Sequence, residues 1–260
     1  MKLLLQSDDY GISRGVARGI VYGIDQGLIR NTGLFANMPW AEECVEWIRP
    51  YLSQIAFGLD LNLTTGRPVL PPEQIPSLVN ADGSFHTSWE SRKLDLALGG
   101  ADHAVRREVL LECEAQIQRF IALVGKKPDY IHPHAYTTPM IMEVQRELAH
   151  QYGIPYSSDV WQNLAGFGVP EYRIEWYKKP ATLENQMDSS LKQYVLDHSA
   201  ELLARDVCIV AGHMGYLDRD LMELSTYTLY RVNDLADVVS EELKAWVKDN
   251  RVELITYRDL

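Results

Sequence analysis

Short apolar runs alternate with longer segments of helical periodicity along this chain of 260 residues, and that alternation limits the folds open to it. Apolar runs typical of strands lie at KLLLQ, NTGLFANMP, IAFGLDLNLT, DYIHPH, GIPYSS, DVCIVAGHMG and VELITY. The intervening segments predict helices over residues 13–27, 41–51, 103–124, 139–152, 183–204 and 232–250. Strands that alternate with helices form a parallel sheet with helices on its faces. We therefore expect an α/β fold, a closed or irregular TIM-like (β/α) barrel, formed by a single domain over residues 1–260.

The composition argues against several classes of partner. The formal net charge is −11, whereas nucleic-acid binding needs a basic face. No apolar run approaches the ~18 residues of a membrane span, and the N-terminus lacks a signal-peptide pattern. The three cysteines, Cys44, Cys113 and Cys208, form no CxxC pair, which favours a reducing compartment. We expect a cytoplasmic protein without a nucleic-acid or membrane partner, and a homodimer is one candidate assembly.

Polar side chains cluster at or near the carboxyl ends of four of the apolar runs. Side chains two apart in a strand share a face, and in a parallel barrel the carboxyl ends of the strands converge on one rim. Carboxylates and imidazoles that meet there can hold a divalent metal and supply acid and base groups. Taken alone, the aspartate pair also suits a surface turn, and each histidine also suits a structural role. The residues are Asp8 and Asp9, Asp60 and Asn62, His132 and His134, and His213.

A series of segments gives these residues a familiar context. SDDYGIS, NTGLFANMP, GLDLNLTTGRPV with PSLVNADGSF, KPDYIHPHAY and AGHMGYLD follow one another, and TYRDL closes the chain. In this order they resemble the YdjC/ChbG family of carbohydrate deacetylases, relatives of the NodB-type polysaccharide deacetylases. The resemblance runs nearly end to end. It implies a deformed (β/α) barrel, a divalent metal, and hydrolysis of an N-acetyl group from an amino sugar such as a chitooligosaccharide.

The resemblance also implies roles for individual residues. Asp9 and His134 match metal ligands of the family, and Asp8 matches its candidate general base. His213 matches a histidine that lies at the active site. These roles are expectations for this chain.

Two positions depart from the family pattern. The motif Gly-Leu-His-Leu-Asn-Leu-Thr carries a metal-binding histidine where this chain has Asp60, and His132 stands where the family has an aspartate. We expect Asp9, Asp60 and His134 to form an oxygen-rich ligand set that favours Mg²⁺ or Mn²⁺, with Zn²⁺ as the other candidate ion. His132 is then a substitute ligand or a residue that supports the ligands. Loss of both metal and activity is the third alternative.

The leading hypothesis is metal-assisted hydrolysis of an amide. Asp8 would take a proton from water, and a protonated His213 would stabilise the oxyanion or protonate the leaving amine. A long segment over residues 64–88, rich in proline and glycine, suits the lining of a sugar-binding cleft. The alternatives are a non-catalytic sugar-binding or regulatory protein, and a hydrolase acting on a different saccharide. The expected substrate contacts are Asn62, Arg67, Tyr136 and Tyr216.

Overall fold

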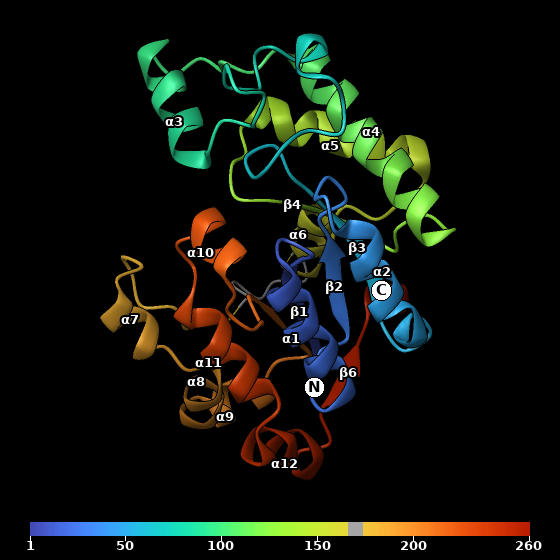
Figure 1. Ribbon diagram of the computed structural model, residues 1–260. Helices are drawn as coiled ribbons and strands as arrows, with labels where there is room; N and C mark the ends of the chain where they lie inside the picture. Colours follow the sequence, from blue (N-terminus) through green and yellow to red (C-terminus); the bar gives the residue numbers. More distant parts are fainter. Residues whose placement is uncertain (166–173) are drawn as a thin grey trace.

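Six parallel strands form the central sheet of the computed structural model, which describes residues 1–165 and 174–260 (Figure 1). Neighbouring strands follow the order β4-β3-β2-β1-β5, and β6 pairs with β1. All pairs of these strands are parallel, which confirms the predicted α/β architecture. The strands are β1 (Lys2–Tyr10), β2 (Asn31–Leu34), β3 (Ala56–Leu61), β4 (Ile131–Pro133), β5 (Val207–Gly212) and β6 (Glu253–Ile255).

The sheet is that of a deformed barrel, and its outer strands β4 and β5 do not pair with each other within the described residues. On one side of β1, β6 pairs with residues 2–4 and β2 pairs with residues 6–10, while β5 pairs along the other side. The outer strands β4 and β5 make isolated contacts, a bridge from Ile131 to Tyr156 and a hydrogen bond from the Ile174 amide to the Ile209 carbonyl. The strand predicted at GIPYSS is therefore reduced to one bridge. The prediction fails because Ser157 already starts a helix, α6 (Ser157–Ala165).

Four of the predicted helices lie close to their expected bounds. The Ser13 hydroxyl accepts the Val16 amide at the start of α1, and Thr138 accepts the Ile141 amide at the start of α5. Within the described ranges, no helix is both long and apolar enough to cross a bilayer. The four are α1 (Arg14–Asp25), α2 (Ala41–Ile48), α4 (Arg106–Val124) and α5 (Pro139–Tyr152), with 3₁₀ turns η1 (Arg49–Tyr51), η2 (Pro72–Gln74) and η3 (Tyr257–Asp259).

Local caps divide the other two predicted helices. Ser190 and Ser240 each accept a hydrogen bond from the amide three residues further on, so each starts a new helix. A helix outside the predicted set, α3, begins with a capping box formed by Thr87 and Glu90. The divided segments contain α7 (Leu183–Met187), α8 (Leu191–Asp197), α9 (Ser199–Leu203), α11 (Leu229–Val238) and α12 (Glu241–Asp249). Two helices outside the predicted set are α3 (Ser88–Ala97) and α10 (Arg219–Leu224).

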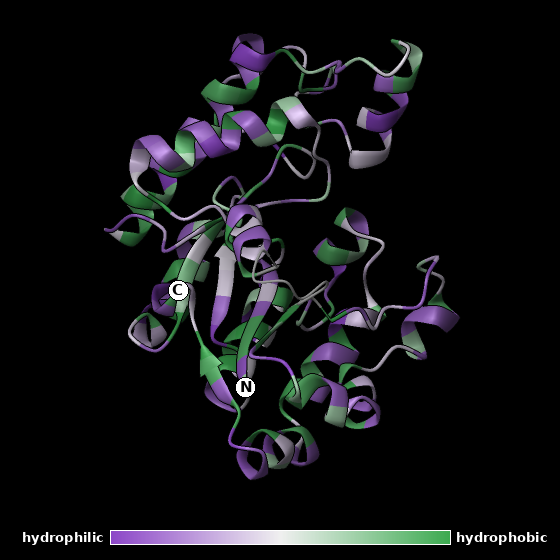
Figure 2. Ribbon diagram, turned by 180° about the vertical axis from the view of Figure 1, so that it is seen from behind, coloured by the Kyte–Doolittle hydropathy of each residue, from purple (hydrophilic) through white to green (hydrophobic). Residues whose placement is uncertain are grey.

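The core lies between the sheet and the helices that cover it. Residues of β1, β2 and β3 are almost all buried, and hydrophobic and hydrophilic residues alternate along the helices (Figure 2). Phe57 of β3 joins the layers, because its ring packs edge-on against Tyr10 with the centroids 5.7 Å apart. The same ring lies 5.4 Å from that of Phe120 on α4.

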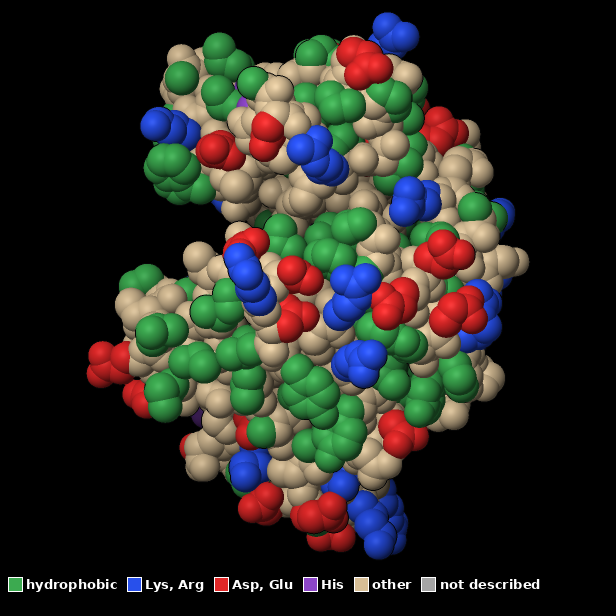
Figure 3. Space-filling view, viewed as in Figure 1, with side chains coloured by type: hydrophobic (Ala, Val, Ile, Leu, Met, Phe, Trp, Pro, Cys, Tyr) green, Lys and Arg blue, Asp and Glu red, His purple; other side chains and the backbone are tan. Residues whose placement is uncertain are grey.

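The helices α3, α4 and α5 form a separate layer above the sheet (Figure 1). The space-filling view shows a deep hollow between this layer and the part of the molecule that contains α10 and α11 (Figure 3). Strand β1 starts at the N-terminus and runs toward the layer, so its carboxyl end lies near the hollow (Figure 1). In parallel α/β folds this end of the sheet is where ligands bind.

We predict that Phe57→Ala lowers the free energy of unfolding by about 3–5 kcal/mol, because it leaves a cavity in a fully buried aromatic cluster. Urea denaturation followed by circular dichroism measures the change. Leu96→Ala is the control, since Leu96 is 76% exposed and its truncation should change the free energy by no more than ~0.5 kcal/mol. Equal losses in the two variants would contradict the proposed core.

Candidate active site

Several of the side chains predicted at the strand ends meet at one edge of the sheet, around the carboxylate of Asp9. Asp9 is 1% exposed and lies near the end of β1. Its Oδ1 atom lies 2.9 Å from His134 Nδ1, and its Oδ2 atom lies 3.8 Å from His213 Nε2. Arg231 Nη2 donates a hydrogen bond to Oδ2 at 2.6 Å. Residues that follow β4 and β5, together with one from α11, therefore converge on a single carboxylate.

Arg231 lies outside the set of residues predicted from the sequence. It is 1% exposed, and its Nε atom donates to the Tyr227 carbonyl at 2.8 Å. The available signal is its place on α11, where Arg231 and Asp234 share the buried face with apolar residues. Charged residues on the apolar face of a helix need buried partners, which marks such positions as candidates for a site.

His134 and Arg231 keep Asp9 ionised. Burial alone would raise the pKa of Asp9, but the charges of His134 and Arg231 hold it well below its usual range. The pair of Asp9 and Arg231 is almost completely withdrawn from solvent. The site therefore contains a fixed negative charge and a fixed positive charge at neutral pH.

A second network holds His213 in place. Asp234 accepts hydrogen bonds from Trp176 Nε1 at 2.8 Å, from the His213 amide at 3.1 Å, and from the Tyr177 hydroxyl. The Tyr177 oxygen also lies 3.2 Å from His213 Nδ1. Burial raises the pKa of Asp234 to about 7 and lowers the pKa of His213 to about 4. His213 is thus a neutral imidazole at neutral pH, in contrast to the protonated histidine of the leading hypothesis.

Asp60 is turned into the sheet. It is fully buried, and its Oδ2 atom accepts the Asp9 amide at 2.7 Å. Its Oδ1 atom has no hydrogen-bond partner among the described residues and lies directly against Gly33. Burial, followed by the charges of Asp8 and Asp9, raises the pKa of Asp60 well above its usual range. Both carboxyl oxygens of Asp60 thus face the backbone of neighbouring strands.

Asp8 lies beside His132, the neighbour of Asp60 in the register of β3 and β4. Asp8 Oδ2 is 3.8 Å from His132 Nε2, and Asp8 Oδ1 accepts a hydrogen bond from Gln6 Nε2 at 2.5 Å. His132 Nδ1 lies 2.7 Å from the Ser157 hydroxyl. The two adjacent aspartates of β1 therefore each approach one histidine from the end of β4.

The expected ligands of a divalent ion are Asp9, Asp60 and His134, and the family resemblance implies two of them, Asp9 and His134. Two of these fit, because Asp9 Oδ1 has no hydrogen-bond partner of normal geometry among the described residues and lies beside His134 Nδ1. Asp60 does not fit, since its oxygens face the Asp9 amide and Gly33. Over residues 1–165 and 174–260, no three acidic, histidine or cysteine side chains are placed to hold one metal ion. The predicted trio therefore does not fit a divalent ion in this arrangement.

Asn62 supports the turn after β3. Its Nδ2 atom donates to Asn37 Oδ1 at 3.0 Å and to the Thr65 carbonyl at 2.7 Å, and its Oδ1 atom accepts the Thr64 and Thr65 amides. The residue is fully buried. Its observed role is to fix the loop, and a contact with substrate stays a prediction.

The two predicted substrate tyrosines differ in access. Tyr136 is 5% exposed, and its hydroxyl donates to Asp95 of α3, so it links the loop after β4 to the upper layer. Tyr216 is 42% exposed, with its ring 6.2 Å from that of Tyr22. Tyr216 is therefore accessible to a ligand, whereas Tyr136 is in a structural position.

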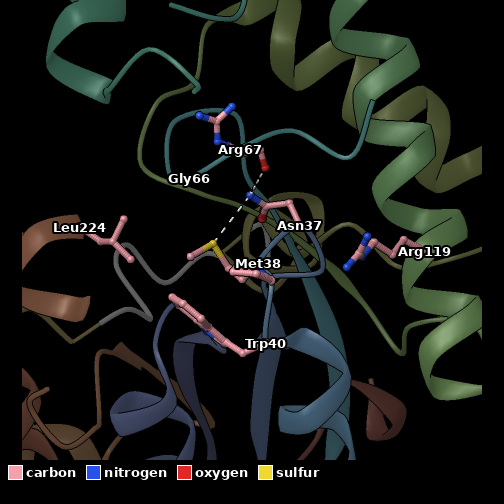
Figure 4. A pocket seen from close by; sticks show the side chains of 8 residues that line it. Asn37, Met38, Trp40, Gly66, Arg67, Arg119 and Leu224 are labelled. Carbon is pink, nitrogen blue, oxygen red and sulfur yellow. Dashed lines mark hydrogen bonds between the residues drawn. The ribbon is translucent and has the colours of Figure 1, made fainter. Parts of the chain in front are cut away.

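Arg67 lines a cavity of about 400 Å³ between the loop after β2 and the loop after β3 (Figure 4). Asn37 closes one side, because its amide donates to the Arg67 carbonyl at 2.9 Å. Trp40 forms another side, held by a 2.6 Å hydrogen bond from its Nε1 atom to the Gly11 carbonyl. The lining residues are Asn37, Met38, Pro39, Trp40, Gly66, Arg67, Arg119 and Leu224.

We predict that Arg231→Met lowers the free energy of unfolding by about 3–5 kcal/mol, because it leaves the buried Asp9 carboxylate without its closest cation. Chemical denaturation at neutral pH measures the loss. Arg14→Met is the matched control, since the Arg14–Glu43 pair is exposed and such pairs contribute ~0–1 kcal/mol. A loss of similar size in the two variants would show that the buried pair is unimportant.

The low pKa of His213 predicts a pH dependence of stability. Below about pH 6.5 His213 is protonated in the unfolded chain, whereas in the folded protein it stays neutral down to about pH 4. The free energy of unfolding therefore falls as the pH falls through this window. In His213→Gln this contribution is absent, and the melting temperature should fall less between pH 7 and pH 5 than in the wild type. His198→Gln, at an exposed histidine, is the control. Identical pH profiles for wild type and His213→Gln would refute the prediction.

Known proteins resemble this chain over its whole length. Carbohydrate deacetylase 2 of Listeria innocua serovar 6a is 30% identical over 264 residues, which covers 100% of this chain and 99% of the relative. A solved structure from Enterococcus faecalis V583, described as a candidate cellobiose-phosphate cleavage protein, superimposes with a TM-score of 0.81 at 22% identity, covering 99% of this chain and 98% of the other.

A less similar solved structure shares the same deformed barrel. It is a family 4 acetyl xylan esterase from Clostridium thermocellum in complex with a cobalt ion, with a TM-score of 0.51 at 9% identity, covering 100% of this chain and 89% of the other. The family model described as YdjC-like protein matches residues 2–249. Because that match and the relative at 30% identity span nearly the whole chain, this protein belongs to the family of YdjC-like proteins.

Proposed function

We propose that this protein hydrolyses the N-acetyl group of an N-acetylated amino sugar or oligosaccharide. Relatives that match the full chain are named carbohydrate deacetylases, which supports the reaction class. The observation that carries the proposal is the ionised Asp9 carboxylate in contact with Arg231 and His134 and close to His213. Amide hydrolysis needs a base for water, a donor for the developing oxyanion and a proton for the leaving amine, and this site contains groups suited to each task.

Asp8 is the group we assign to proton abstraction. It lies at the same strand end as Asp9 and faces His132 Nε2 at 3.8 Å. A carboxylate that takes a proton from water can pass it to a neighbouring imidazole. Since the predicted metal trio does not fit an ion, we assign the chemistry to the side chains of the chain itself.

His213 begins the reaction as a neutral imidazole. Burial lowers its pKa to about 4, so it can donate a hydrogen bond to a carbonyl oxygen or accept a proton, and the Tyr177 hydroxyl contacts its Nδ1 atom. The guanidinium of Arg231 supplies the permanent positive charge near the reacting centre. Hydrolysis transfers the proton lost by the attacking water to the leaving amine, so His213 would protonate the amine only after it has accepted that proton.

The cavity beside the β2 and β3 loops is our candidate for part of the saccharide site. It combines the apolar faces of Met38 and Trp40 with the cation of Arg67. Aromatic and apolar faces pack against sugar rings, while polar groups orient them. The exposed Tyr216 is a further candidate for such a contact.

A non-catalytic saccharide-binding protein is the second candidate function. The observation that favours it is the position of Asp60, whose oxygens face the sheet backbone and leave no three-ligand metal set among the described residues. Such a protein would bind a saccharide in the same cavity without releasing acetate.

We predict that the purified protein releases acetate from di-N-acetylchitobiose. Release is measured in separate assays, one with a chelator and others with added Mg²⁺, Mn²⁺ or Zn²⁺. Asp8→Asn should lower kcat at least about 10²-fold, because it removes the base without changing the shape of the side chain. Asp82→Asn, at an exposed aspartate, is the control. Saccharide binding by calorimetry without acetate under any condition would favour the second candidate, and absence of both would refute both.

A further inference from the structure

Asp9 has a backbone conformation that a residue other than glycine rarely adopts. Its φ angle is +68°, in the left-handed region, which costs a side-chain-bearing residue roughly 1–2 kcal/mol. The conformation accompanies an irregularity in β1. The register with β2 shifts between Ser7 and Tyr10, and a bulge of this kind changes the direction of a side chain. Something in the surrounding structure must therefore stabilise Asp9 in this conformation.

The Asp60 carboxylate reaches Asp9 across strand β2. In the sheet order, β2 lies between β1 and β3, and Asp60 Oδ2 accepts the Asp9 amide at 2.7 Å. The shift in register leaves this amide outside the regular ladder, and Asp60 satisfies it. The hydrogen bond therefore fixes the backbone at the point where β1 departs from regular geometry.

Gly33 makes this crossing sterically possible. It lies in β2, and a Cβ atom at this position would overlap with Oδ1 and Cγ of Asp60. Any larger residue would push the carboxylate away from the Asp9 amide. Gly33 and Asp60 thus form a matched pair, in which the missing side chain of one provides the space for the other.

We infer that Asp60 is a positioning residue, whose carboxylate, seated on Gly33, holds Asp9 in its left-handed conformation and so directs the Asp9 side chain toward His134 and Arg231. This role differs from that of the metal ligand which occupies the same position in the family motif. A positioning role needs only a hydrogen-bond acceptor of the right length, whereas a ligand role needs an anionic oxygen turned toward the ion. Its consequence for catalysis rests on the proposed function, but the hydrogen bond itself can be tested without it.

The experiment compares Asp60→Asn with Asp60→Ala in the full chain. Asparagine keeps an acceptor oxygen at the same reach, and alanine removes it. Hydrogen exchange of the Asp9 amide, followed by NMR, should be at least about tenfold faster in Asp60→Ala and close to wild type in Asp60→Asn. Gly33→Ala should reproduce the faster exchange, because the added methyl group displaces Asp60.

Two further measurements separate positioning from metal ligation. Calorimetric titration with Mg²⁺ and Zn²⁺ should give the same result for wild type and Asp60→Asn. If the wild type releases acetate, kcat should fall about 10²-fold in Asp60→Ala, with KM little changed and with recovery in Asp60→Asn. If the wild type releases none, the proposed function fails, and the exchange rates decide the inference alone.

The inference is overturned if Asp60→Asn loses ion affinity that the wild type possesses, or if the Asp9 amide exchanges equally fast in wild type and Asp60→Ala. Should Asp60→Ala fail to fold, Asp60→Asn and Gly33→Ala still decide. The positioning role is supported if the Asp9 amide exchanges at the wild-type rate in Asp60→Asn and faster in Gly33→Ala. Faster exchange in Asp60→Asn together with the wild-type rate in Gly33→Ala contradicts it.

Discussion

The buried ion pair between Asp9 and Arg231 is the interaction on which the rest of the site depends. It joins the first strand to α11 across 222 positions of the chain. Removing a carboxylate or a guanidinium from water costs on the order of several kcal/mol for each ion. Close contact between the two charges is needed to offset this desolvation cost. The pair therefore fixes where α11 can lie on the sheet. Once α11 is placed there, Asp234 of the same helix face reaches the network around His213.

The site is built by side chains that fix one another's position. Asp9 has a strained backbone, Asp60 satisfies its amide, and Gly33 provides the space for Asp60. On the other side, Asp234 and Tyr177 hold His213 with its imidazole neutral. Polar networks in a low-dielectric interior are stable only when nearly every member is satisfied, so each contact depends on the others. This interdependence gives a rigid arrangement of charges, which is what electrostatic catalysis needs.

Much of the fold could be predicted from local pattern. The parallel α/β architecture and the helices α1, α2, α4 and α5 follow from the spacing of apolar residues. Two of the errors lie where a single polar side chain interrupts a helix that periodicity predicts as continuous. Ser190 and Ser240 accept capping hydrogen bonds and start new helices within segments that otherwise have a continuous helical pattern. The strand expected at GIPYSS is replaced by the start of α6. One capping hydrogen bond has too little effect on average hydrophobicity to be detected by such a pattern.

The sequence by itself determined that the acidic and imidazole residues lie at one edge of a parallel sheet, because the carboxyl ends of parallel strands share an edge. It also determined the family, since the motifs occur in order along the chain. Only the tertiary structure decided that Asp60 turns toward the Asp9 amide, that Arg231 contacts Asp9, and that His213 is neutral. The physical reason is that side-chain direction and charge state depend on neighbours from distant segments, and no local pattern contains those neighbours.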